Sequence, residues 1–398
     1  MATPGRRWGT ASTQRLEHVH RGLAPATAAR PTTPPWSVAG VVAAAADAGR
    51  ELMDGFAQTG FANLGQILTP QELAHYTDAF DKSRLTLDQF WIGNGIWQTE
   101  LQQPLMACKE FDGLLMHPKV LAPLRLLAGG EVCIEDVALR HMGPYNGREI
   151  PGMTSWEPEG AAIEGGVPEK VRGVGNVGRR WHRDGDGGLA WDGHPLGVAY
   201  FQLMVYLADV TDDTHSFAVS PQPVGTPLLD GEGELDHAAQ LARGGLHNLN
   251  GPAGTALLFN IDRLHTVCVR QTTAERKSLQ AYYGHAHVRR RAPEVAPHPG
   301  RLTLCVPPRL WRDHTDPAVR EFFGGCSGAS GAPDAGLNQR SLQFAAAEEA
   351  ARAAGEPAWN IEQAMEKDAA LDVHLLREVS ISHVEAAAKR FGRRLHTP

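Results

Sequence analysis

The chain has 398 residues, of which 42% are hydrophobic and 21% are charged, so its length and composition are those of an ordinary globular protein with a large core. Its net charge of -7 argues against a nucleic-acid-binding protein, which usually carries a basic surface. No segment reaches the roughly 18 apolar residues that a membrane span needs, and the five scattered cysteines lack a Cys-x-x-Cys motif. This cysteine usage favours a reducing compartment over a disulfide framework or a zinc-thiolate site.

The N-terminal segment 1–46 is rich in Ala, Thr, Pro and Arg, and Glu17 is its only acidic residue. Such a composition is typical of a disordered tail and also of an organellar transit peptide. We therefore expect a cytoplasmic protein, with an organellar location as the alternative.

An N-terminal helical region is predicted from about residue 38 to residue 127, because Ala- and Leu-rich segments there have helical spacing. Thr69 would be an N-cap, with Pro70 at the first helical position and Glu72 at the third. A second helix should follow Pro118 and end at Gly129.

A β-rich region is predicted from residue 131 to about residue 290, where short β-branched and aromatic runs alternate with turn residues. The expected strands are Glu131–Leu139, Arg180–Asp184, Val198–Leu207, Ser216–Val219, Thr255–Asn260, His265–Val269 and Arg276–Tyr283. Their number and spacing predict a mainly β jelly roll or sandwich with flanking helices. Phe201, Leu203 and Val205 would face the N-terminal helices. Gln202 would then point into the barrel, either towards a ligand or as a satisfied core residue.

The chain becomes helical again after residue 300, with a Gly/Ser/Ala/Pro loop over 324–336. We expect three regions. They are the tail or transit peptide (1–46), the helical region with the β core (47–300), and a helical extension packed on that core (301–398). The extension would either support the barrel or mediate self-association.

The strongest chemical signal is His182-Arg183-Asp184, because a histidine and a carboxylate two residues apart can bind one metal ion. The pair alone is weak evidence, since the chain has 18 histidines and a second such pair, His314-Thr315-Asp316. Pro317 follows that second pair, which is typical of a capped helix start.

His265 and Arg276 make the His182/Asp184 pair a stronger candidate for a metal site. Two histidines and one carboxylate leave metal positions open for a cosubstrate and dioxygen, a geometry that is diagnostic of Fe(II) oxygenases. Arginine binds a carboxylate with two parallel hydrogen bonds, and Ser278 lies on the same strand face as Arg276. Lys277 would point the other way, into solvent. The sequence therefore predicts His182, Asp184 and His265 as metal ligands, with Arg276, Ser278 and Gln202 at a dicarboxylate cosubstrate.

The His182-x-Asp184, His265 and Arg276 pattern, with its eleven-residue gap, resembles the phytanoyl-CoA dioxygenase (PhyH) family over roughly residues 50–290. The resemblance implies a double-stranded β-helix, Fe(II) at the three ligands, 2-oxoglutarate on Arg276, and O2 as the oxidant. It implies a dioxygenase that hydroxylates a small molecule and releases succinate and CO2. The retained Asp184 favours hydroxylation or a similar oxidation over halogenation.

The resemblance weakens over 213–223, where the family usually has an Asn-Gly turn followed by Pro-Gly-Ser-His. His215 in this segment is expected to be a turn residue. The substrate therefore stays open among an acyl-CoA, an amino acid and a secondary metabolite. A catalytically silent β-barrel binding module is the alternative function.

Other segments carry alternatives of their own. The insertion 144–179 is too long for a turn and would be a lid or disordered. Arg140 and His141 would contact a ligand or lie on the surface, and His285-x-His287 is a weak second metal candidate.

Overall fold

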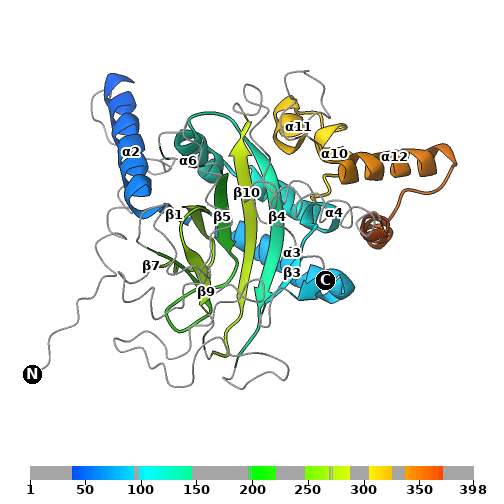
Figure 1. Cartoon of the computed structure of the whole chain (residues 1–398), viewed down its shortest axis with the longest axis horizontal. Coiled ribbons are helices and arrows are strands. Elements are labelled where there is room, and N and C mark those ends of the chain that lie inside the picture. Colours follow the sequence, from blue (N-terminus) through cyan, green and yellow to red (C-terminus); the bar gives the residue numbers. More distant parts are fainter. Residues whose placement is uncertain are drawn as a thin grey trace, which may run out of the picture.

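The computed structural model describes residues 38–93, 98–145, 196, 198, 200–220, 247–268, 270, 272–286, 304–324 and 337–370. Figure 1 shows an antiparallel β core in these ranges, flanked by helices from both ends of the chain. The helices are α2 (Val38–Thr59), α3 (Pro70–Thr86), α4 (Pro104–Ala107), α5 (Asp112–Leu115), α6 (Pro118–Ala128), α10 (Pro308–Trp311), α11 (Pro317–Gly324) and α12 (Gln339–Ala353). A further helix covers 361–370.

The β core consists of two antiparallel sheets. The large sheet has the order β1-β8-β5-β10-β4-β3-β2, and the small sheet has the order β7-β6-β9. The strands are β1 (Phe61–Gln66), β2 (Trp91–Gly93), β3 (Gln98–Leu101), β4 (Val132–Met142), β5 (Tyr200–Tyr206), β6 (Ser216–Val219), β7 (His247–Asn248), β8 (Thr255–Asn260), β9 (His265–Cys268) and β10 (Arg276–His285).

From β5 to β10 the chain alternates between the sheets, as in a double-stranded β-helix: β5 is in the large sheet, β6 and β7 in the small one, then β8, β9 and β10 alternate. The predicted fold class, mainly β with flanking helices, is confirmed. Strands β6 and β8 have their predicted bounds, and β4, β5, β9 and β10 differ from theirs by one to three residues. The predicted strand 180–184 lies outside the described residues.

The N-terminal region is less helical than predicted, because β1, β2 and β3 lie within it and extend the large sheet. Phe61 of β1 pairs with Phe259 of β8, nearly two hundred residues later. β3 pairs with β4, and β2 pairs with β3. Such short segments have no clear period of their own, so distant pairing partners decided their conformation.

The predicted helix ends are confirmed. The Thr69 hydroxyl accepts a hydrogen bond from the Glu72 backbone N–H, and the Glu72 carboxylate accepts one from the Thr69 backbone N–H. α6 ends at Gly129 with a φ of 68°, the left-handed conformation that favours glycine. The Asp316 carboxylate accepts a hydrogen bond from the Ala318 N–H at the start of α11, so the second His-x-Asp pair caps a helix as predicted.

The large sheet separates two hydrophobic clusters, and this separation orients β5 as predicted. On one face Phe201, Leu203 and Val205 pack with residues of the N-terminal helices, including Phe56, whose ring centroid is 5.7 Å from that of Phe201. On the other face β5 contributes Tyr200, Met204 and Tyr206 to a cluster with residues of the small sheet. Gln202 shares this second face, which is the interior of the barrel.

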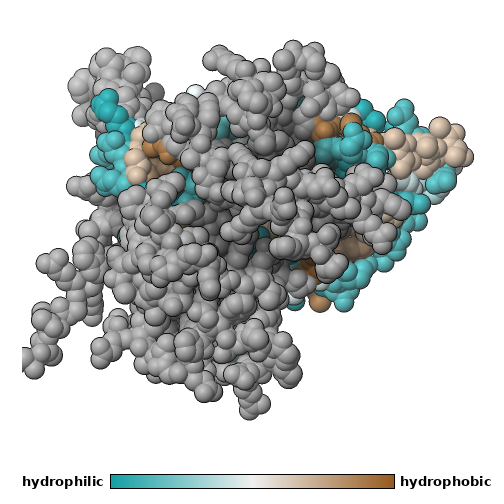
Figure 2. All heavy atoms as spheres, viewed as in Figure 1, coloured by the Kyte–Doolittle hydropathy of each residue, from teal (hydrophilic) through white to brown (hydrophobic). Residues whose placement is uncertain are grey.

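The C-terminal helices contribute side chains to the first cluster. Phe322 of α11 lies beside Tyr283 of β10, with ring centroids 6.0 Å apart. Arg340 of α12 forms a buried ion pair with Asp368, with an Nη2 to Oδ2 distance of 2.6 Å. Figure 2 shows hydrophilic residues together with smaller hydrophobic areas on the described surface near α2 and near the C-terminal helices. Within the described residues, no helix is both long and apolar enough to cross a membrane.

Candidate metal and dicarboxylate site

The structure describes four of the six predicted site residues. His265, Arg276, Ser278 and Gln202 all lie on strands of the barrel and are almost completely buried. The predicted ligands at 182 and 184 lie outside the described residues, so the metal triad stays a prediction. Within the described ranges no three His, Cys, Asp or Glu side chains form a metal-binding group.

His265 is held in a defined orientation at the first position of β9. Its backbone pairs with Val219 of β6, and its ring lies 5.3 Å from that of Phe217 and 5.6 Å from that of Phe259, by ring centroids. Its Nδ1 lies 2.8 Å from the Arg263 carbonyl oxygen, which can only accept a hydrogen bond. In the neutral ring Nδ1 therefore donates and the lone pair is on Nε2, as in histidines that bind metals through Nε2.

The turn before His265 is fixed by the C-terminus of α2. The Arg263 guanidinium donates hydrogen bonds to the carbonyl oxygens of Ala57 and Gln58, at 3.3 and 3.1 Å. These are carbonyls of the last helical turn, where a positive charge is favourable. Gly60 has a φ of 74°, and a Cβ at this position would lie 2.3 Å from the Arg263 Nε. The Arg263 side chain therefore occupies the space that a Cβ at residue 60 would need.

Arg276 is fully buried at the first position of β10, and its hydrogen-bond partners are neutral. Nη1 donates to the Ser216 carbonyl oxygen at 2.9 Å, and Nη2 donates to Gln98 Oε1 at 3.0 Å. Among the described residues its Nε has no hydrogen-bond partner, and no carboxylate there pairs with the guanidinium. Burial is the main cause that lowers the pKa of Arg276 to about 10, so the side chain is positively charged at pH 7.

Ser278 lies next to Arg276 on the interior face of β10. It is fully buried, and its hydroxyl has no hydrogen-bond partner among the described residues. Its Cα partners are Arg140 of β4 and Tyr206 of β5, and the Tyr206 hydroxyl donates to the Leu249 carbonyl oxygen at 2.5 Å. The barrel wall therefore has a positive charge and an unsatisfied hydroxyl side by side, which suits a carboxylate.

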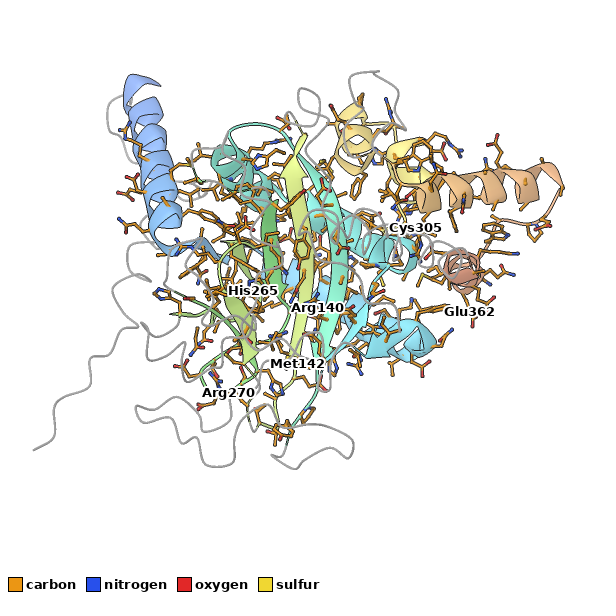
Figure 3. All side chains as sticks on the ribbon, viewed as in Figure 1. Arg140, Met142, His265, Arg270, Cys305 and Glu362 are labelled. Carbon is orange, nitrogen blue, oxygen red and sulfur yellow. The ribbon has the colours of Figure 1, made fainter. Side chains whose placement is uncertain are left out.

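His265 and Arg276 lie at opposite ends of the four-residue strand β6. Val219 pairs with His265, and Ser216 at the other end accepts the hydrogen bond from Arg276. Three residue steps of about 3.4 Å separate these ends by roughly 10 Å. Figure 3 shows His265 at the upper end of β9 and Arg270, which follows β9, below it.

Two glutamines extend the polar interior face. Gln202 lies in the barrel as predicted, and its Nε2 donates to Gln280 Oε1 at 2.9 Å. The sequence did contain a signal for Gln280, because this residue continues the alternation of Arg276 and Ser278 along one strand face. Gln98, which binds Arg276, had no such signal because it lies on a strand of the region predicted as helical.

His215 and His285 have structural hydrogen bonds. His215 Nε2 lies 2.8 Å from the Gly143 carbonyl oxygen, and its Nδ1 accepts from the Arg270 backbone N–H at 3.1 Å. Burial lowers the pKa of His215 to about 4. His285 has a backbone carbonyl oxygen near each ring nitrogen, at 3.3 and 2.7 Å. Its prospective partner at 287 lies outside the described residues.

The remaining candidates form ion pairs. Arg140 Nε lies 3.2 Å from a Glu100 carboxylate oxygen, and His141 Nε2 lies 3.4 Å from one of Glu275. Lys277 points away from Arg276 as predicted, but its side chain is only 17% exposed and its Nζ is 2.6 Å from Asp81. It is a partner of α3 and not a solvated residue. The insertion 146–179 lies outside the described ranges.

Several solved structures are similar to part of the chain. The α-ketoglutarate-dependent epimerase SnoN of nogalamycin biosynthesis is 16% identical over 61% of this chain and 82% of its own, with a TM-score of 0.43. EctD from S. alaskensis, with 2-oxoglutarate and 5-hydroxyectoine, is 19% identical over 60% and 76%, with a TM-score of 0.43. HygX from Streptomyces hygroscopicus, with nickel, 2-oxoglutarate and hygromycin B, is 16% identical over 59% and 86%, with a TM-score of 0.38.

Neither a protein-family model nor a curated protein sequence matches the chain. With identities and TM-scores this low, the three solved structures assign no activity, cofactor or substrate to it.

Proposed function

We propose that the protein is an Fe(II)- and 2-oxoglutarate-dependent dioxygenase that hydroxylates a small molecule and converts 2-oxoglutarate to succinate and CO2. One observation carries the proposal. Arg276 is a fully buried cation with neutral partners, and within the described part of the chain its Nε and the neighbouring Ser278 hydroxyl have no hydrogen-bond partner. Burying an unpaired charge is costly, so a bound carboxylate is the simplest explanation for this arrangement.

The barrel interior suits a dicarboxylate between Arg276 and His265. The distal carboxylate would accept hydrogen bonds from Arg276 and Ser278, and the other end would reach a metal ion at His265. The roughly 10 Å between the two ends of β6 is a span that a five-carbon dicarboxylate and a metal ion can bridge. His182 and Asp184 would complete the ligand set. Bound Fe(II) would supply oxygen activation coupled to oxidation of the cosubstrate.

The protein's own groups would bind, orient and exclude water. The carbonyl of Arg263 keeps the His265 lone pair on Nε2, and the rings of Phe217 and Phe259 cover the imidazole. Gln98 and the Ser216 carbonyl hold the guanidinium of Arg276 in place. The substrate class stays among an acyl-CoA, an amino acid and a secondary metabolite.

Anaerobic titration with Fe(II) and 2-oxoglutarate tests this function, because a metal-chelating 2-oxo acid gives a visible charge-transfer band. We expect the band in the wild type and its loss in His182→Ala and His265→Ala. His314→Ala is the matched control from the other His-x-Asp pair, and it should leave the band unchanged. No band in the wild type, or a full band in His182→Ala, refutes the site. Succinate release with added oxygen then separates an oxygenase from a silent binding module.

A further inference from the structure

Two buried glutamines lie on the barrel wall between the ends of the proposed site. Gln280 follows Arg276 and Ser278 on the interior face of β10, and Gln202 faces the same interior from β5. Gln202 pairs with Phe259, whose ring lies 5.6 Å from that of His265. The glutamine pair therefore lies at the level of His265, and Gln280 is one step nearer to Ser278.

The two amides satisfy only half of their hydrogen-bonding groups. Gln202 Nε2 donates to Gln280 Oε1 at 2.9 Å, whereas Gln202 Oε1 and Gln280 Nε2 have no hydrogen-bond partner in the described ranges. The residues are only 2% and 1% exposed. A buried amide group without a partner destabilises the fold, so its presence beside a ligand site calls for a ligand that satisfies it.

The chemistry of the unsatisfied groups does not depend on how the amide oxygens and nitrogens are assigned. One amide-amide hydrogen bond uses one donor and one acceptor, so the pair always leaves an N–H donor beside a C=O acceptor. A carboxylate only accepts hydrogen bonds, and an ammonium group only donates them. A hydroxyl or a carboxamide does both.

We propose that Gln202 and Gln280 are specificity-determining residues that bind a neutral hydroxyl or carboxamide group of the substrate. The inference rests on the proposed function, which places the substrate near His265. A plain acyl chain would leave both amide groups unsatisfied, and a carboxylate or an ammonium group alone would satisfy only one of them. Among the open substrate classes, this disfavours the hydrocarbon chain of an acyl-CoA at this position and favours a small molecule that carries hydroxyl or amide groups.

The proposal can be tested without knowing the substrate, by saturation-transfer NMR on protein loaded with Zn(II) and 2-oxoglutarate. The probes are propionamide, 1-propanol, propionate and propylammonium, which have the same three-carbon skeleton and differ in their polar group. We expect the first two to bind wild-type protein more tightly than the last two. The double variant Gln202→Met, Gln280→Met should weaken the binding of propionamide and of 1-propanol by about tenfold. This is the effect of losing one or two hydrogen bonds.

Gln89→Met is the matched control, because Gln89 is exposed and lies in the short turn Asp88–Phe90, on neither β5 nor β10. This variant should leave the binding affinity of all four probes unchanged. Gln280→Glu covers the case in which the double variant does not fold. Its carboxylate still accepts from Gln202 Nε2 but offers only acceptors, so the preference should shift towards propylammonium.

Three results would overturn the inference. They are equal binding of propionate and propionamide, no binding of any probe, and a tenfold or greater loss of 2-oxoglutarate affinity in the double variant. The last result would assign the glutamines to the cosubstrate. Failure of the proposed function itself is distinguishable, because the wild type would then lack the Fe(II) and 2-oxoglutarate band.

Discussion

Replacing Arg276 with glutamine should weaken 2-oxoglutarate binding by roughly a hundredfold. The variant removes the positive charge that faces Ser278 but keeps a polar side chain near Gln98 and the Ser216 carbonyl. A carboxylate on Arg276 would receive about two charge-assisted hydrogen bonds, and each contributes about 1.5 kcal/mol or more. The loss of about 3 kcal/mol corresponds to roughly two orders of magnitude in Kd.

The stability of the ligand-free variant separates a binding role from a structural one. The charge of Arg276 is buried without a carboxylate partner among the described residues, so its removal relieves a desolvation penalty while two neutral hydrogen bonds are weakened. We expect the free energy of unfolding to change by less than about 2 kcal/mol. Breaking a structural buried ion pair would instead cost about 3 to 5 kcal/mol.

The assay for Arg276→Gln is the anaerobic titration of the charge-transfer band, combined with urea denaturation of the ligand-free protein. Arg312→Gln is the matched control, because Arg312 pairs with Asp313 at the surface, and it should leave the Kd unchanged. A Kd within about threefold of the wild type would refute the role of Arg276, and so would loss of metal binding with normal folding.

Three further changes test the packing around the barrel. Gly60→Ala should destabilise the protein by about 2 to 4 kcal/mol in urea denaturation and weaken metal binding, because the new Cβ meets Arg263 and φ is positive. His215, with its pKa lowered from 6.5 to about 4 by burial, binds a proton more readily when unfolded. Acidification from pH 6.5 to 4 should therefore cost up to about 3 kcal/mol of unfolding free energy. Asp368→Asn should cost about 3 to 5 kcal/mol, because it removes the negative charge from the buried ion pair with Arg340.

Each change has a control. Gly55→Ala lies inside α2 with nothing within 4 Å of its Cβ, so it should stabilise the helix by about 0.5 to 1 kcal/mol. His215→Asn should lose the pH-dependent part of the stability between pH 6.5 and 4; the same slope in both proteins would contradict the assignment. Replacing Arg340 and Asp368 together with apolar residues should be nearly neutral, and a loss as large as that of Asp368→Asn alone would refute the ion-pair account.

The sequence by itself determined the features whose signals are local. Thr69 and Asp316 cap helices through their nearest neighbours, Gly129 ends a helix through its own φ, and β6 and β8 are short β-branched or aromatic runs between turns. Alternation along β5 and β10 placed Gln202, Arg276 and Ser278 on one face, because the side-chain period of a strand does not depend on its partners.

The tertiary structure determined the features that depend on strand pairing between segments far apart in the sequence. β1 and β3 became strands because β8 and β4 offer unpaired edges, and neither partner can be read from the local sequence. The pairing of β3 with β4 brought Gln98 onto Arg276, and the pairing of β5 with β10 brought Gln280 beside Gln202. Local patterns determine which face a residue occupies, whereas only the closed barrel determines which faces meet. For that reason the sequence could propose Arg276 as the anchor of a dicarboxylate, which stays a prediction, and the structure added the neighbours that hold Arg276 and the amides on the same barrel wall.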